Sequence, residues 1–236
     1  MKFKLLYILP ITLIALMTSC KKDNYDEPTS KLSGRIVYQG QSLGFENSQV
    51  PYELYQFGFG KVGPIGASFA QDGSYSTLLF DGQYKLIIPN GQGPFLWPKT
   101  ASGAPDTLLI NLKGNTQLDI EVTPYYMIRN ATYSASGNAV TANFGVEKIV
   151  TDPAMARDIE RVALFINKTQ FVSSAGVNRI ADAGINGSAI ADPSQISLSV
   201  NIPSITPTQN YVFARVGVKV AGVEDWLYGP LEKLTY

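Results

Sequence analysis

The sequence contains no histidine and only one cysteine. A single cysteine excludes an intrachain disulfide and any zinc site built from several thiolates. Histidine is the commonest general base near neutral pH and the commonest ligand of transition metals, so its absence excludes serine–histidine and cysteine–histidine hydrolases. We therefore expect no cofactor and no metal, while carboxylate-pair chemistry and oxygen-ligand calcium sites remain chemically open.

The chain also lacks an excess of either charge, because 19 basic and 19 acidic residues give a formal net charge of 0. No long-range field would attract nucleic acid, so we expect no nucleic-acid partner. Hydrophobic residues make up 45% and charged residues 16% of the 236 positions, which is typical of a folded globular protein with one or two domains.

The apolar run near the start of the chain is too short for a spanning helix. It covers residues 5–17, whereas a transmembrane helix needs about 20 apolar residues. A positive start, this apolar run and small residues before Cys20 follow the order of a secretory signal peptide. Residues 1–19 are therefore predicted to be a cleaved signal peptide.

The segment Met17-Thr18-Ser19-Cys20 consists of an apolar residue, two small residues and the only cysteine. It resembles the lipobox of bacterial lipoproteins. The resemblance implies cleavage before Cys20 and diacylglycerol on its sulfur, with a further acyl chain in many bacteria. Several acyl chains on one residue anchor a protein to a membrane stably. Cys20 is the predicted lipidation site, and the membrane is a predicted partner.

Residues 20–30 are polar and charged, and we expect them to form a flexible tether. Lysines followed by acidic residues after Cys20 resemble the surface-export signal of Bacteroidetes lipoproteins. We accordingly expect an outer-membrane lipoprotein exposed at the cell surface. An orientation that faces the periplasm is the alternative.

From Leu32 onward, apolar and polar residues alternate with a period of two, which is typical of half-buried strands. Asp-Gly and Asn-Gly pairs separate the runs and predict tight turns. Strands are expected at residues 32–38, 50–55, 74–79, 84–88, 107–112 and 116–122. Short strands with regular turns indicate a first β-sandwich domain over residues 31–124.

Three segments of this domain resemble carboxypeptidase-regulatory-like domains of the transthyretin-like class: Ser33-Gly34-Arg35-Ile36-Val37, Asp72-Gly73-Ser74-Tyr75 and Asp81-Gly82-Gln83-Tyr84. The resemblance implies a Greek-key sandwich that serves as a structural or binding unit.

Pro124 ends the last strand of the first unit, so the domain seam is expected there. Strands are predicted at residues 127–133, 139–146, 160–167, 196–202, 211–220 and 223–228, with a short helix from Asp152 to about Asp158 and a long loop at 173–194. Residues 125–236 are similar to an immunoglobulin-like or fibronectin-like sandwich without the disulfide. The predicted fold class is all-β, with two tandem β-sandwich domains.

The whole chain resembles a Bacteroidetes family of two-domain lipoproteins of unknown function. The resemblance rests on Thr18 to Asp26, Asp81 to Leu86, Glu121 to Tyr125 and the end Glu232-Lys233-Leu234. It implies association with outer-membrane glycan-uptake systems of the starch-utilisation type. The implied partners are a polysaccharide and an outer-membrane transporter complex.

Two segments offer aromatic side chains for sugar binding, which requires flat rings and hydrogen-bonding groups. The Gly- and Pro-rich loop 90–98 carries Phe95 and Trp97, and the segment after a predicted hairpin carries Trp226 and Tyr228. These four residues are the candidate ligand contacts. The alternatives are that Trp97 caps the sandwich and that Trp226 lies in the core.

Carboxylates offer two further hypotheses. Asp119 and Glu121 share a strand face about 7 Å apart, a spacing compatible with glycoside hydrolysis but also with an ordinary solvent face. Asp72, Asp81 and Asp106 lie at predicted turns, where we interpret them as turn residues rather than calcium ligands.

The sequence therefore predicts a non-catalytic outer-membrane lipoprotein that acts as an accessory glycan-binding component of a polysaccharide-uptake system. A structural or assembly lipoprotein that binds a partner protein without glycan affinity is the alternative. A carboxylate-based glycan hydrolase is a remote alternative.

Overall fold

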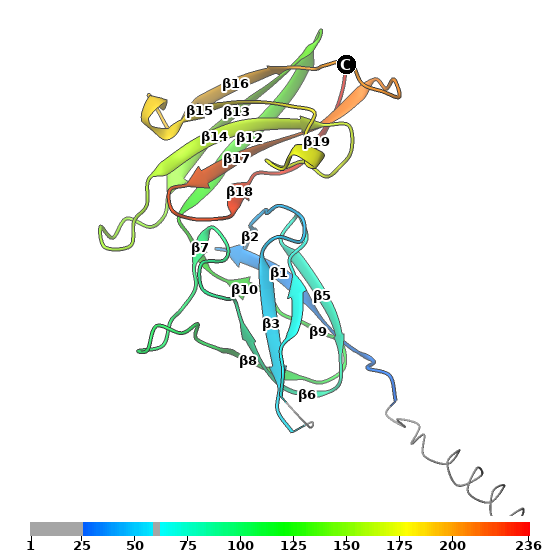
Figure 1. The fold of residues 1–236 in the computed structure, drawn as a ribbon, viewed down its shortest axis with the longest axis vertical. Helices are drawn as coiled ribbons and strands as arrows, with labels where there is room; N and C mark the ends of the chain where they lie inside the picture. Colours follow the sequence, from blue (N-terminus) through cyan, green and yellow to red (C-terminus); the bar gives the residue numbers. More distant parts are fainter. Residues whose placement is uncertain (1–25, 59–61) are drawn as a thin grey trace, which may run out of the picture.

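The computed structural model describes residues 26–58 and 62–236. Residues 1–19, Cys20 and most of the predicted tether lie outside the described residues. The described chain forms two all-β domains stacked along the long axis of the molecule (Figure 1), which confirms the predicted fold class. Among the described residues, none of the helices has the length and apolar character needed to span a bilayer.

The N-terminal domain is built from two sheets and a short ribbon. One sheet has the order β4-β3-β6-β8, the other gathers β2, β5, β9 and β10 around β1, and β7 pairs with β11. The strands are β1 (Ser30–Tyr38), β2 (Gln41–Ser42), β3 (Pro51–Gln56), β4 (Ile65–Ser68), β5 (Ser74–Leu79), β6 (Gly82–Ile87), β7 (Phe95–Leu96), β8 (Leu108–Leu112), β9 (Thr116–Gln117), β10 (Ile120–Glu121) and β11 (Thr123–Pro124).

Alternation along the strands places one face of each sheet in the core. On β3, Tyr52 and Leu54 are buried, whereas Glu53 and Tyr55 on the other face are only partly covered. Opposite residues in β6 and β5 complete the same core, in which the rings of Tyr52 and Tyr75 lie 5.4 Å apart in an edge-on arrangement. The period of two in the sequence therefore arises because alternate residues point to the core face and to the outer face of each sheet.

The predicted single strand at 116–122 is instead divided into β9 and β10, both parallel to β1. Leu118 N still donates to Ser33 O (2.8 Å), so the segment follows β1 closely. A Cβ atom on Gly34 would lie 1.9 Å from Leu118 O, which explains why glycine occupies this position of β1.

The C-terminal domain has a sheet of order β12-β13-β16 and a second sheet of order β15-β14-β17-β18, with β19 also paired to β17. The strands are β12 (Tyr126–Ser136), β13 (Ala139–Lys148), β14 (Ile159–Asn167), β15 (Ala181–Asn186), β16 (Ile196–Asn201), β17 (Tyr211–Val220), β18 (Trp226–Tyr228) and β19 (Glu232–Thr235), and the 3-10 turns are η1 (Gly176–Asn178) and η2 (Gly187–Ala189).

Two sequence-based expectations for this domain are wrong. No helix follows Asp152: its carboxylate accepts a hydrogen bond from Ala154 N (2.9 Å), but the chain makes only a turn and continues to β14. The segment 173–194 is not a plain loop, because it contains η1, β15 and η2. Pairing with β14 stabilises β15 although its small residues have low intrinsic strand propensity.

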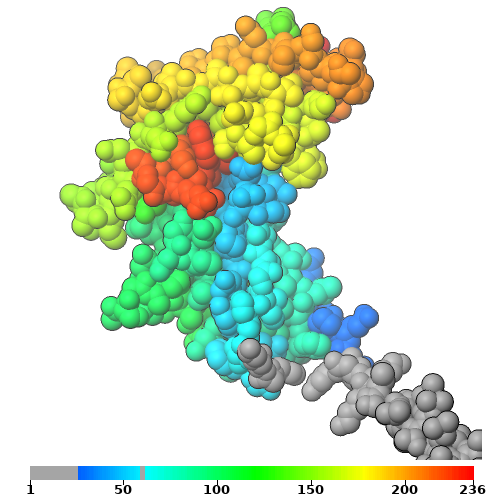
Figure 2. Space-filling model, viewed as in Figure 1, coloured from blue at the N-terminus to red at the C-terminus, as the bar shows by residue number. Residues whose placement is uncertain are grey.

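The two domains dock through turns of the N-terminal domain that lie on the outer face of β17 and β18. Tyr228 N donates to Gly44 O (2.9 Å), which forms a single antiparallel bridge across the junction. Figure 2 shows the red C-terminal strands in contact with blue residues of the N-terminal domain. Most buried apolar side chains of both domains belong to one continuous cluster, whereas Tyr228 packs in a smaller one with Phe165 and Val172.

Arg215 of β17 lies at the centre of the junction and is only 2% exposed. Its Nε donates to Gly229 O (2.8 Å), Nη1 to Phe45 O (2.7 Å) and Nη2 to Gln71 O (2.7 Å). The Tyr228 ring faces the guanidinium carbon at 4.7 Å. One planar cation therefore joins carbonyl groups of both domains.

Burial lowers the pKa of Arg215 to about 10, so the side chain stays charged at neutral pH. A buried charge is tolerated only when its hydrogen-bonding capacity is met, here by carbonyl oxygens and a ring face. The fit is close, because a Cβ atom on Gly44 would lie 2.2 Å from Arg215 Nη2.

We expect Arg215→Met to lower the free energy of unfolding by roughly 3 kcal/mol, because it leaves buried carbonyl oxygens without a charged donor. Urea denaturation followed by circular dichroism measures the change. Arg35→Met, at an exposed arginine of the same junction, is the matched control and should change stability by less than about 0.5 kcal/mol. Equal midpoints for Arg215→Met and wild type would show that the guanidinium does not stabilise the fold.

Candidate functional site

A cleft of about 670 Å³ lies at the junction of the two domains and includes the edge of the Arg215 site. The N-terminal domain supplies β2, the turn after it and the turn before β5. The C-terminal domain supplies the start of β12, the segment after β14 and the segment after β18. Clefts between domains are common ligand sites, and this volume falls within the usual range for them.

Polar side chains form much of the cleft wall. Arg35, Asn47 and Gln170 line it, and their side chains form no hydrogen bond within the part of the chain that the structure describes. Phe171, 41% exposed, lies beside them. The cleft therefore combines available hydrogen-bonding groups with an accessible ring.

Other cleft residues are engaged in holding the domains together. Gln71 Nε2 donates to Gln170 O (2.9 Å), and Gln71 Oε1 accepts from Val172 N (3.0 Å). Gln41 Oε1 accepts from Arg129 Nη1. These two amides therefore fix the shape of the cleft across the junction.

Asp72 is the carboxylate of the cleft. Partial burial opposes its ionisation, but hydrogen bonds from the Ser74 hydroxyl and backbone N–H, with Arg35 nearby, hold the pKa of Asp72 below its usual value. The carboxylate is thus ionised and fixed in the turn before β5, where it can accept hydrogen bonds but is a poor proton donor.

The aromatic residues expected to bind a ligand take different positions. Phe95 is only 4% exposed and its ring lies 6.0 Å from that of Phe45, so it is a core residue. Tyr228, 3% exposed, lies under Arg215 and its hydroxyl accepts from Ser174 N (2.8 Å). Phe95 is therefore enclosed by the core, whereas Tyr228 is almost fully buried but still contributes to the cleft lining, and the expectation that these rings contact a ligand stays a prediction.

The two tryptophans are partly buried. Trp97 Nε1 donates to Asp106 O (2.9 Å), which ties its loop to the segment before β8. Trp226 stacks on Tyr228 with ring centroids 6.1 Å apart and meets Phe165 edge-on at 5.3 Å. Both indoles keep some exposed surface but have structural partners.

The structure joins the two aromatic segments at the junction. Gly93 N, in the loop that precedes Phe95, donates to Asp225 Oδ2 (2.7 Å), beside Trp226. Burial, with Glu224 nearby, raises the pKa of the Asp225 carboxyl despite this hydrogen bond. Residues 132 positions apart thus form one interdomain contact that the spacing in the sequence did not indicate.

The remaining candidate carboxylates accept hydrogen bonds from backbone N–H groups. Asp119 Oδ1 accepts from Arg35 N (2.9 Å), and Glu121 Oε1 accepts from Gln39 N (2.6 Å). Asp81 accepts from Ser30 Oγ and from Gly114 N (2.8 Å). Within residues 26–58 and 62–236, no three acidic or thiol side chains are arranged to hold a metal ion.

A second cavity of about 610 Å³ lies within the C-terminal domain. Tyr126, Val146, Ile159 and Ile190 are among its apolar lining residues, and Lys148 is a charged one. Lys148 Nζ is 3.9 Å from Asp158 Oδ1, so charges at this site are partly paired. It brings together no group that the sequence singled out as functional.

Comparison with protein families gives two adjoining matches. The model described as the protein of unknown function (DUF3823) N-terminal domain matches residues 30–123, and the domain of unknown function DUF3823_C matches residues 126–233. No curated protein matches the chain.

Solved structures show the same fold. A DUF3823 family protein from Parabacteroides merdae is 37% identical, with a TM-score of 0.74 over 89% of this chain and 100% of that one. A DUF3823 family protein from Bacteroides ovatus is 30% identical, with a TM-score of 0.75 over 88% and 99%. A candidate carbohydrate-binding protein from Bacteroides uniformis is 17% identical, with a TM-score of 0.64 over 89% and 100%.

The Asp225 contact predicts a specific pH dependence. An acid whose pKa is raised on folding adds stability below its unfolded pKa of about 3.9, and this stability is lost as pH rises through the folded pKa. Asp225→Asn keeps an acceptor for Gly93 but does not titrate. We therefore expect the unfolding free energy of Asp225→Asn, relative to wild type, to increase as pH rises from about 4 to 7.

Urea titrations of both proteins across this pH range measure the difference, and Asp225→Ala, which removes the acceptor, is the control. A difference that is constant with pH or falls with it would contradict the assignment.

Proposed function

The chain belongs to the DUF3823 family, and we propose that it is a non-catalytic outer-membrane lipoprotein that binds polysaccharide in the junction cleft. The predicted membership in a two-domain family is confirmed by the comparisons. The lipid anchor, the ligand and the location are parts of the proposal.

The observation that carries the proposal is the set of side chains in the cleft. Arg35, Asn47 and Gln170 have side-chain donors and acceptors that form no hydrogen bond among the described residues, and Phe171 offers a partly exposed ring next to them. A sugar presents hydroxyl groups around its ring and an apolar face of C–H groups, so it matches this combination.

One relative supports the choice of ligand class. The protein from Bacteroides uniformis with the same fold is described as a candidate carbohydrate-binding protein. At 17% identity the likeness shows a shared fold, so the cleft residues of this chain carry the argument for sugar binding.

The environment of the carboxylates favours binding over hydrolysis. Glycoside hydrolysis needs one carboxyl group that stays protonated and a second that is ionised, both facing the same bond. Asp119 and Glu121 are exposed and each accepts a backbone N–H of β1 or the turn after it. Asp72 is held ionised by Ser74.

The location rests on the start of the sequence. The signal-peptide order of residues 1–19 and the only cysteine at position 20 favour lipidation of Cys20, and the lysines and acidic residues that follow favour the outer membrane and the cell surface. A surface lipoprotein that holds polysaccharide would serve an outer-membrane transporter complex as an accessory component.

We expect the purified mature protein to bind at least one soluble polysaccharide in affinity electrophoresis or calorimetry. Asn47→Ala combined with Phe171→Ala should weaken binding about tenfold or more, because it removes a hydrogen-bonding group and a stacking surface. Trp97→Ala combined with Trp226→Ala is the comparison pair, since these side chains lie outside the cleft lining.

Binding of no polysaccharide from a broad panel would contradict the proposal. Loss of binding in the tryptophan pair alone would place the sugar on the aromatic loops instead. Recovery of a transporter complex with the protein, in the absence of any glycan affinity, would favour an assembly role.

A further inference from the structure

The end of the N-terminal domain farthest from the junction exposes a group of large apolar side chains. We name this group the tip patch; its members are Phe57, Val62, Ile65, Leu78 and Phe80, which are between 37% and 62% exposed. They come from the end of β3, the start of β4, the end of β5 and the turn that follows. Both sheets of the sandwich therefore contribute to one apolar end.

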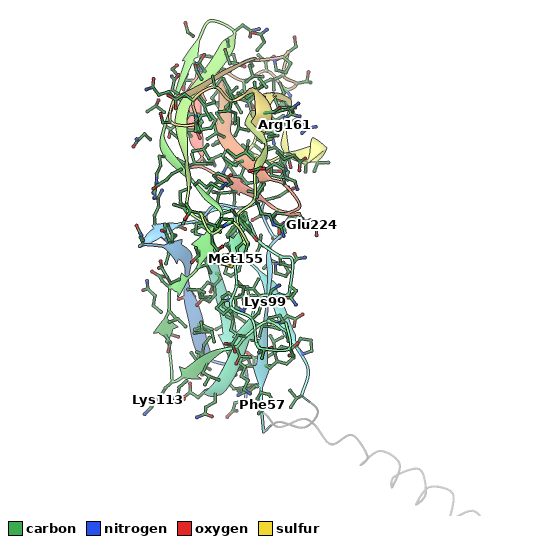
Figure 3. All side chains as sticks on the ribbon, turned by 90° about the vertical axis from the view of Figure 1, so that its left-hand side faces the viewer. Phe57, Lys99, Lys113, Met155, Arg161 and Glu224 are labelled. Carbon is green, nitrogen blue, oxygen red and sulfur yellow. The ribbon has the colours of Figure 1, made fainter. Side chains whose placement is uncertain are left out.

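The backbone pairing places these segments together. Ser30 opposes Leu79 in the β1–β5 ladder, so the chain enters the domain where β5 ends. Asp81, in the turn after β5, accepts from Ser30 Oγ and Gly114 N, and its carbonyl accepts from Gln56 Nε2 (3.5 Å). Figure 3 shows Phe57 and Lys113 at this end, and Figure 1 shows the chain entering there.

The position of the predicted lipid limits what can lie against this end. Ser30 lies ten positions after Cys20, and a chain of that length spans at most about 35 Å when fully extended and about 18 Å as a coil. A lipid on Cys20 would therefore hold the tip patch close to the bilayer at a high effective concentration.

The charged residues at the same end do not favour a purely electrostatic contact with a membrane. Lys31, Lys85 and Lys113 are exposed there, and they are offset by Asp26, Glu27 and Asp81. Lys85 Nζ lies 4.9 Å from the centroid of the Phe57 ring, so its stem runs along the patch while its ammonium group can reach lipid headgroups. An apolar patch flanked by lysines is more stable at a lipid surface than exposed to bulk water.

We propose that the tip patch inserts into the lipid surface and is a second membrane contact beside the acyl chains on Cys20. This inference rests on the lipid anchor of the proposed function. Insertion would tilt the long axis of the molecule out of the membrane plane, because the strand ends that carry the patch and the C-terminal domain lie at opposite ends of the molecule (Figure 1). The junction cleft would then face the medium rather than the lipid.

The single native cysteine makes a direct test possible. When Cys20 carries lipid as a thioether, an introduced cysteine is the only reactive thiol. The lipidated protein is reconstituted in phosphatidylcholine vesicles with an environment-sensitive fluorophore at Leu78→Cys. The matched control carries it at Val177→Cys, which is 89% exposed in the C-terminal domain.

We expect lipid-borne quenchers to reduce the fluorescence of the label at position 78 by at least half and to leave that at position 177 unchanged. Phe57→Ser combined with Ile65→Ser should restore most of the emission at position 78, whereas Leu109→Ser, at an exposed apolar residue of β8, should not. Addition of anionic lipid should change these values little.

Equal quenching at both positions would overturn the proposal. Protection of the cysteine at position 78 from labelling in cells but not in vesicles would also overturn it, because a protein would then cover the patch. The mass of the N-terminal peptide reports lipidation separately: an unlipidated Cys20 would remove the anchor and this proposal together. Glycan affinity is measured independently, so failure of insertion leaves the sugar-binding result intact.

Discussion

The relative position of the two domains depends on one buried cation. The guanidinium of Arg215 needs acceptors in the plane of its three nitrogens, and the docked state supplies them from Gly229 on its own side and from Phe45 and Gln71 across the junction. Because a buried charge without acceptors is strongly disfavoured, only those docked arrangements that bring these carbonyl groups to the cation are stable. The absence of a side chain on Gly44 leaves the space that this arrangement requires.

The cleft is a consequence of the same docking. Turns of the N-terminal domain meet the outer face of β17 and β18 at Arg215 and Tyr228, and the space beside this contact is lined from both sides. Gln71 completes the arrangement by bonding to the segment after β14 with its amide. Other side chains, such as Asn47 and Phe171, line the cleft without making these contacts. The fixed geometry of the junction would give a ligand a preformed site.

Local patterns in the sequence predicted most strands, because alternation and turn pairs depend on neighbours in the chain. The strand expected at residues 211–220 is confirmed with the same bounds. Two failures occur where a distant partner decides: β15 depends on β14, and the division of the strand at 116–122 depends on its path along β1. The third is local, because Asp152 caps only a turn. Pro124 and the strand patterns on either side of it predicted two domains, and the family resemblance covered both of them.

The site was less predictable for the same reason. On β17, Val212, Ala214 and Val216 face the core, so alternation places Arg215 on an outer face where an arginine is usually exposed. Nothing in the spacing of the sequence indicates that a second domain covers it, or that the same docking buries Tyr228.

The claim that Arg215 makes the two domains one cooperative unit can be tested with the two tryptophans, since Trp97 lies in the N-terminal domain and Trp226 in the C-terminal domain. Urea unfolding is followed by fluorescence in Trp97→Phe and in Trp226→Phe, each with Arg215 and with Arg215→Met. Coincident transitions with Arg215 that separate into two with Arg215→Met are the predicted result. Two separate transitions with Arg215 present, or coincident ones after its replacement, would contradict the account.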